Sequence, residues 1–239
     1  MHPLQHQTAI VTGASSGIGA AVARVLDQAG MNLLVTGRRQ KELARVAEGC
    51  RSAAVVVGDI ADPALPRVLV DEALANFGRC DVLVNNAAVM EVGSVDDIDI
   101  ERVCTMVRIN VEAAYRMAYT FLKHARKLDR GHLVNISSTL GTKVRPGAGA
   151  YAGTKFAIEA LSEALRVELA RTGVRVTVIE PGLVKTHLQD HFKVHPAREL
   201  GVSRMLEPQD VAQCVRFALE QPPHVRIQRL MVAPTGQPL

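Results

Sequence analysis

Apolar residues along this chain alternate between short continuous runs and longer stretches in which they recur with a period near 3.6 residues. The short runs predict buried β-strands at residues 8–12, 32–36, 52–60, 81–89, 132–136, 174–182 and 227–232. The longer stretches predict helices at residues 20–30, 40–49, 63–77, 98–126, 150–171 and 208–220. Because a helix follows each strand except the last, we expect an α/β fold with a parallel sheet of about seven strands and helices on both faces.

The composition fits a single domain spanning residues 1–239. Hydrophobic residues make up 48% of the chain, yet only 3% of residues are aromatic and there is no Trp. The core must therefore consist of Ala, Val, Leu and Ile, whose small side chains suit close packing of helices on buried parallel strands.

The net charge of +4 and the pI near 9.0 raise the question of a nucleic-acid partner. The positive residues are scattered, however, with no run of five or more, and few aromatic residues are present to stack on bases. We therefore expect no nucleic-acid partner. A modest excess of Lys and Arg also suits a cofactor that carries phosphate.

Neither a membrane nor a metal is indicated. The first thirteen residues lack a signal-peptide pattern and no apolar run approaches the length of a membrane span, which predicts a soluble, cytoplasmic protein. The four cysteines (Cys50, Cys80, Cys104 and Cys214) are far apart and lack the spacing of a zinc site, so we expect reduced thiols and no metal.

The first predicted strand runs into a glycine-rich turn and a helix, which is the order of a dinucleotide-binding unit. Gly13, Gly17 and Gly19 have the spacing G-x-x-x-G-x-G, which suits a tight turn, a close approach to a pyrophosphate and close packing of the helix. We expect this turn to bind a cofactor through Gly13, Ser15, Ser16, Gly17, Ile18 and Gly19. A glycine-rich turn with no ligand is the alternative that this motif alone leaves open.

The end of the second strand distinguishes between two cofactors. An acidic residue about 20 residues past the glycine turn would bind a ribose hydroxyl, but Arg38 and Arg39 stand here instead. A guanidinium is a permanently charged fork suited to phosphate, so we expect NADP(H). Asp59 and Ile60, at the end of the third strand, are candidates to contact the adenine. Asn86 and Ala87 follow the fourth strand, where Asn85 and Asn86 suit a turn that ties strand ends together.

Candidate chemistry is concentrated between residues 138 and 155. Tyr151 and Lys155 are four residues apart, which puts both on one face of a helix. A phenol has a pKa of about 10, and a nearby ammonium would pull that pKa toward neutral pH. Ser138, at the end of the preceding strand, is placed to donate a hydrogen bond to a substrate oxygen. The three residues suit hydride transfer with proton exchange at Tyr151.

The longest irregular stretch, residues 183–207, predicts a substrate loop. It contains His187, His191 and His195 at four-residue spacing, a pattern that a metal site can use, although no carboxylate partner accompanies it. Its basic residues are Lys185, Lys193, Arg198 and Arg204. These residues fit either a basic rim for an anionic substrate or a solvated surface, and the sequence does not choose between them.

Taken together, the chain resembles the short-chain dehydrogenase/reductase family over nearly its whole length. The motifs that carry the resemblance are TGASSGIG at residues 12–19, Asp59, NNAA at residues 85–88, Asn110, Ser138, YAGTK at residues 151–155, and Pro181–Gly182 with Thr186. The resemblance implies a single Rossmann-type, doubly wound domain. The family usually has Gly where Ala88 stands, so some crowding beside the cofactor is expected. The IEPG segment and the PTGQ ending look like the clavulanate dehydrogenase-like and short hydroxy-acid dehydrogenase branch.

The resemblance also implies roles for these residues. Tyr151 is the acid–base group, Lys155 binds the nicotinamide ribose and lowers the Tyr151 pKa, and Ser138 orients the carbonyl. Asn110 supports a water-linked proton relay through Lys155. Pro181, Gly182 and Thr186 contact the nicotinamide end of the cofactor.

The function implied is an NADPH-dependent oxidoreductase that interconverts a ketone or aldehyde with an alcohol. The alternative is a non-catalytic NADP(H)-binding regulatory protein on the same fold. Family members commonly form homodimers or homotetramers through two long helices, which here are residues 98–126 and 150–171.

Overall fold

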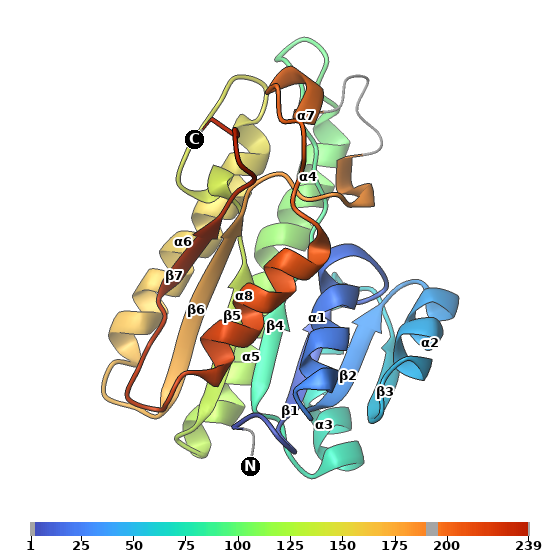
Figure 1. The fold of residues 1–239 in the computed structure, drawn as a ribbon, viewed down its shortest axis with the longest axis vertical. Coiled ribbons are helices and arrows are strands. Elements are labelled where there is room, and N and C mark those ends of the chain that lie inside the picture. Colours follow the sequence, from blue (N-terminus) through green and yellow to red (C-terminus); the bar gives the residue numbers. More distant parts are fainter. Residues whose placement is uncertain (1–2, 190–195, 239) are drawn as a thin grey trace.

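A seven-stranded, wholly parallel sheet forms the centre of the protein, and the prediction of its fold class is confirmed (Figure 1). The computed structural model describes residues 3–189 and 196–238. The strand order is β3-β2-β1-β4-β5-β6-β7. The strands are β1 (Thr8–Thr12), β2 (Asn32–Gly37), β3 (Ala53–Val57), β4 (Val82–Asn85), β5 (Gly131–Ile136), β6 (Val174–Pro181) and β7 (Arg229–Val232).

Helices cover both faces of the sheet because successive strand residues point to opposite sides. Ala9 and Val11 of β1 pack into one core cluster with α1, α2 and α8, whereas Ile10 packs into the opposite cluster with α3, α5 and α6. All three side chains are completely buried. The helices are α1 (Gly17–Gln28), α2 (Gln40–Glu48), α3 (Leu65–Phe77), α4 (Ile100–Val107), α5 (Ala114–Lys127), α6 (Gly149–Glu168), α7 (Pro196–Glu199) and α8 (Pro208–Glu220).

The structure corrects two of the predicted helices. The helix expected at residues 63–77 begins at Leu65, with Pro66 rather than Pro63 in its first turn. The helix expected at residues 98–126 consists of α4, a π-helix at Arg108–Ala113 and α5. A π-turn widens the backbone hydrogen-bonding pattern and is often found at functional sites. Asn110 lies inside it, so the predicted helix is interrupted in its middle.

The described parts of the predicted loop, residues 183–189 and 196–207, contain secondary structure that the sequence does not indicate. It contains a short 3₁₀-helix at His187–Gln189 and the helix α7. Val184 and Leu206 form a parallel bridge that closes the base of the loop. Of the residues singled out in the sequence, His191, Lys193 and His195 lie outside the described part of the chain.

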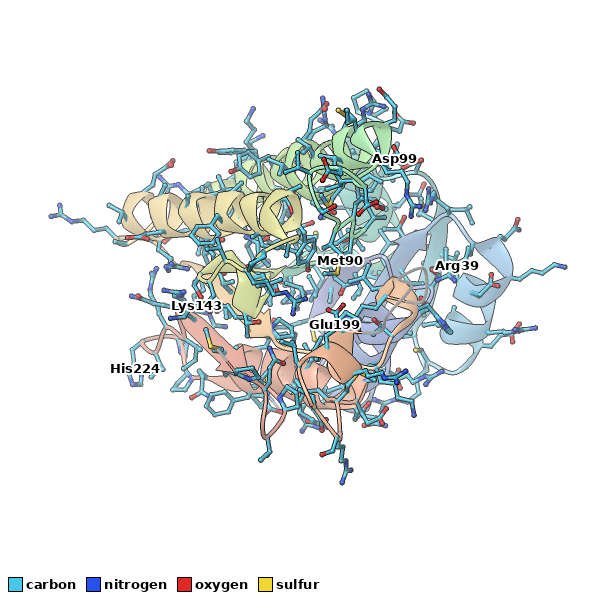
Figure 2. The ribbon with its side chains drawn as sticks, turned by 90° about the horizontal axis from the view of Figure 1, so that it is seen from above. Arg39, Met90, Asp99, Lys143, Glu199 and His224 are labelled. Carbon is cyan, nitrogen blue, oxygen red and sulfur yellow. The ribbon has the colours of Figure 1, made fainter. Side chains whose placement is uncertain are left out.

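The strand order fixes where a ligand can bind. In the sheet, β1 has β2 as its neighbour on one side and β4 on the other. The chain connections that follow β1 and β4 therefore run in opposite directions, and they diverge between these two strands. Open parallel sheets bind ligands at such a divergence, beyond the carboxyl ends of the strands. Figure 2 looks onto this edge. Within residues 3–189 and 196–238, no helix is both long and apolar enough to span a membrane.

Candidate active site

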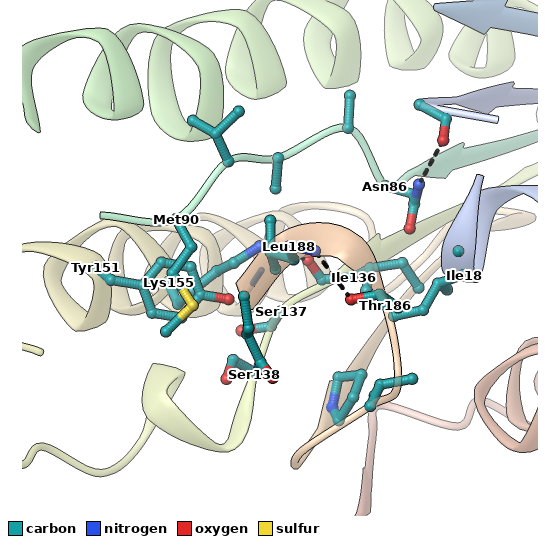
Figure 3. A pocket seen from close by; sticks show the side chains of 18 of the residues that line it. Ile18, Asn86, Met90, Ile136, Ser137, Ser138, Tyr151, Lys155, Thr186 and Leu188 are labelled. Carbon is teal, nitrogen blue, oxygen red and sulfur yellow. Dashed lines mark hydrogen bonds between the residues drawn. The ribbon is translucent and has the colours of Figure 1, made fainter. Parts of the chain in front are cut away.

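A cavity of about 670 Å³ lies over the carboxyl ends of the strands. It extends from the glycine turn after β1 to the first turn of α6, where Tyr151 lies (Figure 3). Every predicted site residue except Gly19 and Asn110 lines it. Those that do are Gly13, Ser15, Ser16, Gly17, Ile18, Arg38, Arg39, Asp59, Ile60, Asn86, Ala87, Ser138, Tyr151, Lys155, Pro181, Gly182 and Thr186.

The glycine turn has the geometry that its spacing predicts. Gly13 and Gly17 have φ of +64° and +53°, a left-handed conformation that glycine adopts readily. Gly19 does not line the cavity. A Cβ there would lie 2.5 Å from the Gly13 carbonyl oxygen, so glycine is needed for the helix to approach the turn closely. Ser16 occupies the N-cap of α1 without a side-chain capping bond, so its hydroxyl does not satisfy the amides of the first turn.

The Arg39 guanidinium bridges the end of β2 and the glycine turn. Its Nη2 donates to Ser15 Oγ at 2.8 Å and to Ser16 Oγ at 2.6 Å, and its Nε donates to Ser15 Oγ at 3.1 Å. Because no carboxylate among residues 3–189 and 196–238 neutralises it, its charge is available to a ligand in the cavity. Asp59 lies near this end too, with Oδ1 accepting from the Ala61 amide at 3.0 Å.

Asn85 and Asn86 tie the strand ends together, as predicted. Asn86 Nδ2 donates to the Thr12 carbonyl at 2.9 Å, and Thr12 Oγ1 accepts from the Asn86 amide at 2.9 Å. Asn85 Nδ2 donates to Asn135 Oδ1 at 3.1 Å, linking β4 to β5. The side chains of these turns thus brace β1, β4 and β5 at the point where the strand connections diverge.

Tyr151, Lys155 and Ser138 meet at the other end of the cavity, as Figure 3 shows. Tyr151 is buried, and burial raises its pKa to about 12, although its side-chain hydrogen bond with Ser138 opposes that rise. Lys155 is also buried, and burial lowers its pKa to about 8, while the negative charge of Glu159 opposes the fall. Burial and Ser138 account for the Tyr151 pKa here, and the expectation that Lys155 lowers that pKa stays a prediction. The Lys155 ammonium is turned to the Ile136 carbonyl, to which Nζ donates at 2.9 Å.

The Asn110 side chain is buried, and both the oxygen and the nitrogen of its amide group form hydrogen bonds. Its Oδ1 accepts from the Val89 amide at 2.9 Å and its Nδ2 donates to the Val89 carbonyl at 2.8 Å. Nδ2 also lies 3.2 Å from Thr154 Oγ1, on the residue next to Lys155. Asn110 therefore joins the π-helix, the segment after β4 and α6, and it shapes the cavity wall from behind.

Several lining residues carried no motif that the sequence analysis used. Met90, Leu140 and Leu188 pack with Tyr151 in a small apolar cluster. Lys143 and Arg145 line the cavity from the segment before α6, whereas Lys185 pairs with Glu207 at 3.8 Å. Arg198 and Arg204 do not line the cavity either. The position of Lys143 and Arg145 between Ser138 and Tyr151 is the signal that could have identified them.

The carboxyl end of the chain also reaches the cavity. Gln237 Oε1 accepts from the Leu183 amide at 2.8 Å, beside the Pro181–Gly182 turn. A Cβ on Gly182 would lie 2.4 Å from this oxygen, so a larger residue there would displace the Gln237 side chain. Across the described ranges, no group of three or more His, Cys, Asp or Glu side chains is arranged to hold a metal ion.

Comparison with known proteins extends over nearly the whole chain. A family model described as short chain dehydrogenase matches residues 7–196. An uncharacterized oxidoreductase of Staphylococcus saprophyticus subsp. saprophyticus is 35% identical, over 98% of this chain and 100% of its own length. The closed form of serine dehydrogenase complexed with NADP+ aligns with a TM-score of 0.90 and 30% identity, over 98% of this chain and 97% of that one. A 3-ketoacyl-(acyl-carrier-protein) reductase from Brucella melitensis complexed with NADH aligns with a TM-score of 0.88 and 28% identity, over 96% of this chain and 98% of that one.

Proposed function

The chain belongs to the short-chain dehydrogenase family, and on this premise we propose that it is an NADPH-dependent oxidoreductase that interconverts a ketone or aldehyde with an alcohol. One observation carries the proposal. A single cavity has the glycine turn and two arginines at one end, and the buried group of Tyr151, Ser138 and Lys155 at the other. Such a cavity suits a long dinucleotide with its reactive end beside an acid–base group.

The residues present fit a dinucleotide with a 2′-phosphate. Gly13 and Gly17 bring the backbone close to the cavity, and α1 points its amino end toward it, where partial positive charge favours a pyrophosphate. Arg38 and Arg39 lie where a 2′-phosphate would be held, and neither forms an ion pair within the described residues. Ala88 also lines the cavity, so its methyl group is the one departure from the family pattern that a cofactor would meet.

When bound, the nicotinamide supplies a hydride to the carbonyl carbon or takes one from the alcohol. Ser138 donates a hydrogen bond to the substrate oxygen and orients it. In reduction, Tyr151 gives its phenolic proton from Oη to that oxygen; in oxidation, Oη takes the proton back. The positive charge of Lys155 lies beside Tyr151 and stabilises the phenolate that remains when Tyr151 has given up its proton. Asn110 is a positioning residue that holds the segment after β4 and α6 in register.

A titration of the purified protein with NADPH and NADH, followed by NADPH-consumption assays on a panel of ketones and aldehydes, tests this proposal. We expect tighter binding of NADPH than of NADH and turnover of some panel members. Preference for NADH would contradict the role given to Arg38 and Arg39. Binding of NADPH without turnover would favour the non-catalytic regulatory protein instead. That outcome requires that no ketone or aldehyde of the panel is reduced with NADPH and that no corresponding alcohol is oxidised with NADP+.

We extend the proposal to assembly as a homodimer or homotetramer. Large apolar side chains are exposed on α5 and α6, where Tyr119, Phe156 and Val167 are 46%, 41% and 75% exposed. Exposed apolar groups of this kind mark interaction surfaces when they gather on one face. Light scattering coupled to size-exclusion chromatography would measure the mass, and a monomer at micromolar concentration would contradict this part of the proposal.

A further inference from the structure

The end of the cavity at Ser138 and Tyr151 contains positive charge that the proposed cofactor does not use. The formally charged side chains among the described lining residues are Arg38, Arg39, Asp59, Lys143, Arg145 and Lys155. Arg38, Arg39 and Asp59 belong to the ends of β2 and β3, and Lys155 belongs to the group around Tyr151. Lys143 and Arg145 are the charged lining residues that belong to neither of these groups. In Figure 2, Lys143 lies on the opposite side of Met90 from Arg39.

Backbone contacts fix Lys143 and Arg145 close to the reacting residues. The Lys143 amide donates to the carbonyl of Thr139, the residue after Ser138, at 3.2 Å. The Arg145 carbonyl accepts from the Ala148 amide at 3.2 Å, and Ala148 is the N-cap of the helix whose first turn carries Tyr151. The two cations therefore lie on the short segment that joins Ser138 to Tyr151.

No carboxylate in the described part of the chain neutralises either side chain. Within residues 3–189 and 196–238, the side chains of Lys143 and Arg145 make no ion pair and no hydrogen bond. By contrast, Arg102 on α4 pairs with Glu91 at 2.9 Å, so acids are available to arginines elsewhere around this edge. Two unpaired cations on a cavity wall raise the local concentration of anions.

The cavity lining also includes a buried polar atom without a partner. Gln189 lines the cavity and is only 7% exposed, and its Oε1 has no hydrogen-bond partner among the residues that the structure describes. A buried acceptor left unpaired costs free energy, which a hydroxyl or amide donor on a bound ligand would recover. Beside Tyr151 the wall is apolar, formed by Met90, Leu140 and Leu188. The arrangement suits a substrate with a carbonyl group, a short apolar segment and a polar, charged end.

We propose that Lys143 and Arg145 form an anion-binding subsite that selects carbonyl substrates bearing a carboxylate or phosphate group away from the reacting carbon. This inference rests on the proposed function of the cavity. The basic rim is therefore built by the segment before α6, and not by Lys185, Arg198 and Arg204 of the predicted substrate loop. Arg145 contributes the planar fork that pairs with an oxyanion through two hydrogen bonds, and Lys143 contributes a mobile point charge.

Matched pairs of probes test the subsite. The carboxylate pairs are 4-oxobutanoate and 6-oxohexanoate with their methyl esters, and the phosphate pair is glyceraldehyde 3-phosphate with glyceraldehyde. With NADPH saturating, we expect at least one anion to exceed its neutral partner about tenfold in kcat/KM, through KM. Arg145→Gln and Lys143→Gln should each reduce that advantage about fivefold, as expected for a partly exposed charge pair, and leave the neutral partner unchanged. The pair that shows the larger advantage distinguishes carboxylate from phosphate.

A matched control separates the subsite from general charge effects. Lys127→Gln removes the same charge from an exposed residue at the end of α5, away from the cavity, and should leave the preference for the anion intact. Equal kcat/KM for anionic and neutral partners in the wild-type protein would overturn the inference while leaving the proposed function standing. An equal loss of both partners in Arg145→Gln would also overturn it.

A binding measurement does not depend on turnover. Calorimetric titration of the NADPH-loaded protein with hexanoate and with inorganic phosphate should show binding of one of them, weakened about tenfold or more in the double variant Lys143→Gln/Arg145→Gln. Unchanged binding in the double variant, or no binding of either probe to the wild-type protein, would overturn the subsite. Failure of the proposed function shows itself differently, as absence of NADPH consumption with neutral and anionic carbonyls alike.

Discussion

Lys155 Nζ lies 5.8 Å from the centroid of the Tyr151 ring while donating to the Ile136 carbonyl at 2.9 Å. The hydrogen bond anchors the ammonium to the end of β5, and the ring of Tyr151 lies beside it on the same face of α6. Both residues are almost completely buried. A phenol and an ammonium are thus enclosed together at the wall of a cavity that reaches the glycine turn.

Replacement of Tyr151 by Phe should abolish turnover and spare NADPH binding. The change removes the only hydroxyl proposed to exchange a proton with substrate, whereas the ring and its packing with Met90 remain. We expect a loss of at least about a hundredfold in kcat, the low end of what a positioned acid–base group contributes. Single-turnover consumption of NADPH and fluorescence titration measure the two quantities. Turnover near the wild-type rate would refute the assignment.

The affinity of the free protein for NADPH should fall as pH rises through the Lys155 pKa of about 8. Burial depresses this pKa, so the ammonium loses its charge above about pH 8, whereas an exposed lysine would keep its charge to about pH 10. We expect affinity to drop about fivefold or more between pH 7 and pH 9.5, because the Lys155 charge is proposed to contact the nicotinamide ribose. Lys155→Met should bind weakly with little pH dependence. An unchanged pH dependence in Lys155→Met would assign it to another group.

Arg39→Gln should weaken NADPH binding about tenfold or more and leave NADH binding nearly unchanged. The guanidinium is held by Ser15 and Ser16 at the wall of the cavity, so its charge is preorganised for a phosphate. Arg45→Gln is the matched control, since Arg45 is an exposed arginine of α2 that does not line the cavity. Equal weakening of both cofactors would indicate that Arg39 supports the glycine turn rather than the 2′-phosphate.

Arg229→Gln should lower the free energy of unfolding by about 2–3 kcal/mol. Arg229 Nε donates to Glu180 Oε1 at 2.6 Å, and the Glu180 side chain is only 1% exposed. Removing the cation leaves a buried carboxylate without its partner, and Glu159, 3.6 Å from Arg229, loses the same neighbour.

The matched control for Arg229 is Arg67→Gln. Arg67 also pairs with a carboxylate, that of Asp71 at 2.7 Å, but the two side chains are 79% and 52% exposed. Urea unfolding should show a change within about 0.5 kcal/mol for this variant. The double variant Arg229→Gln/Glu180→Gln should recover part of the lost stability, and no recovery would mean that Arg229 acts through packing alone.

Stability should also decline as pH falls below about 6.5, in part because of His132. Burial and the charges of Arg175 and Arg226 lower the His132 pKa well below its usual value, and the ring pairs with Thr177 Oγ1 at 2.8 Å. The unfolded chain then binds a proton that the folded chain does not, so this group contributes stability at neutral pH that is lost on acidification, at up to about 1.4 kcal/mol per pH unit.

His132→Gln should flatten this decline between pH 6.5 and pH 5, measured by urea unfolding at each pH. His224→Gln, at an exposed histidine near the end of the chain, should leave the slope as it is in the wild-type protein. Equal slopes in the wild type and His132→Gln would show that His132 is not the group responsible.

The order and type of the elements follow from the sequence alone, because the spacing of apolar residues is a local property. Strand β1 at Thr8–Thr12 and helix α8 at Pro208–Glu220 have the predicted bounds. Gly13 adopts the left-handed backbone that its turn position requires, and the four-residue separation of Tyr151 and Lys155 places both on one face of α6. A buried parallel sheet leaves these signals intact, since its strands are continuous apolar runs.

Contacts between residues distant in the chain were decided only by the tertiary structure. The side-chain amide of Asn110 forms hydrogen bonds with the Val89 backbone, and burial raises the Tyr151 pKa, an effect that local spacing does not reveal. Lys143 and Arg145 gain a candidate role from the cavity that they line, whereas Lys185, Arg198 and Arg204 of the predicted loop do not line it. Burial and electrostatic environment depend on what packs around a side chain. A periodic pattern predicts which face of a helix or strand is buried, but it does not predict which atoms of other elements pack against that face.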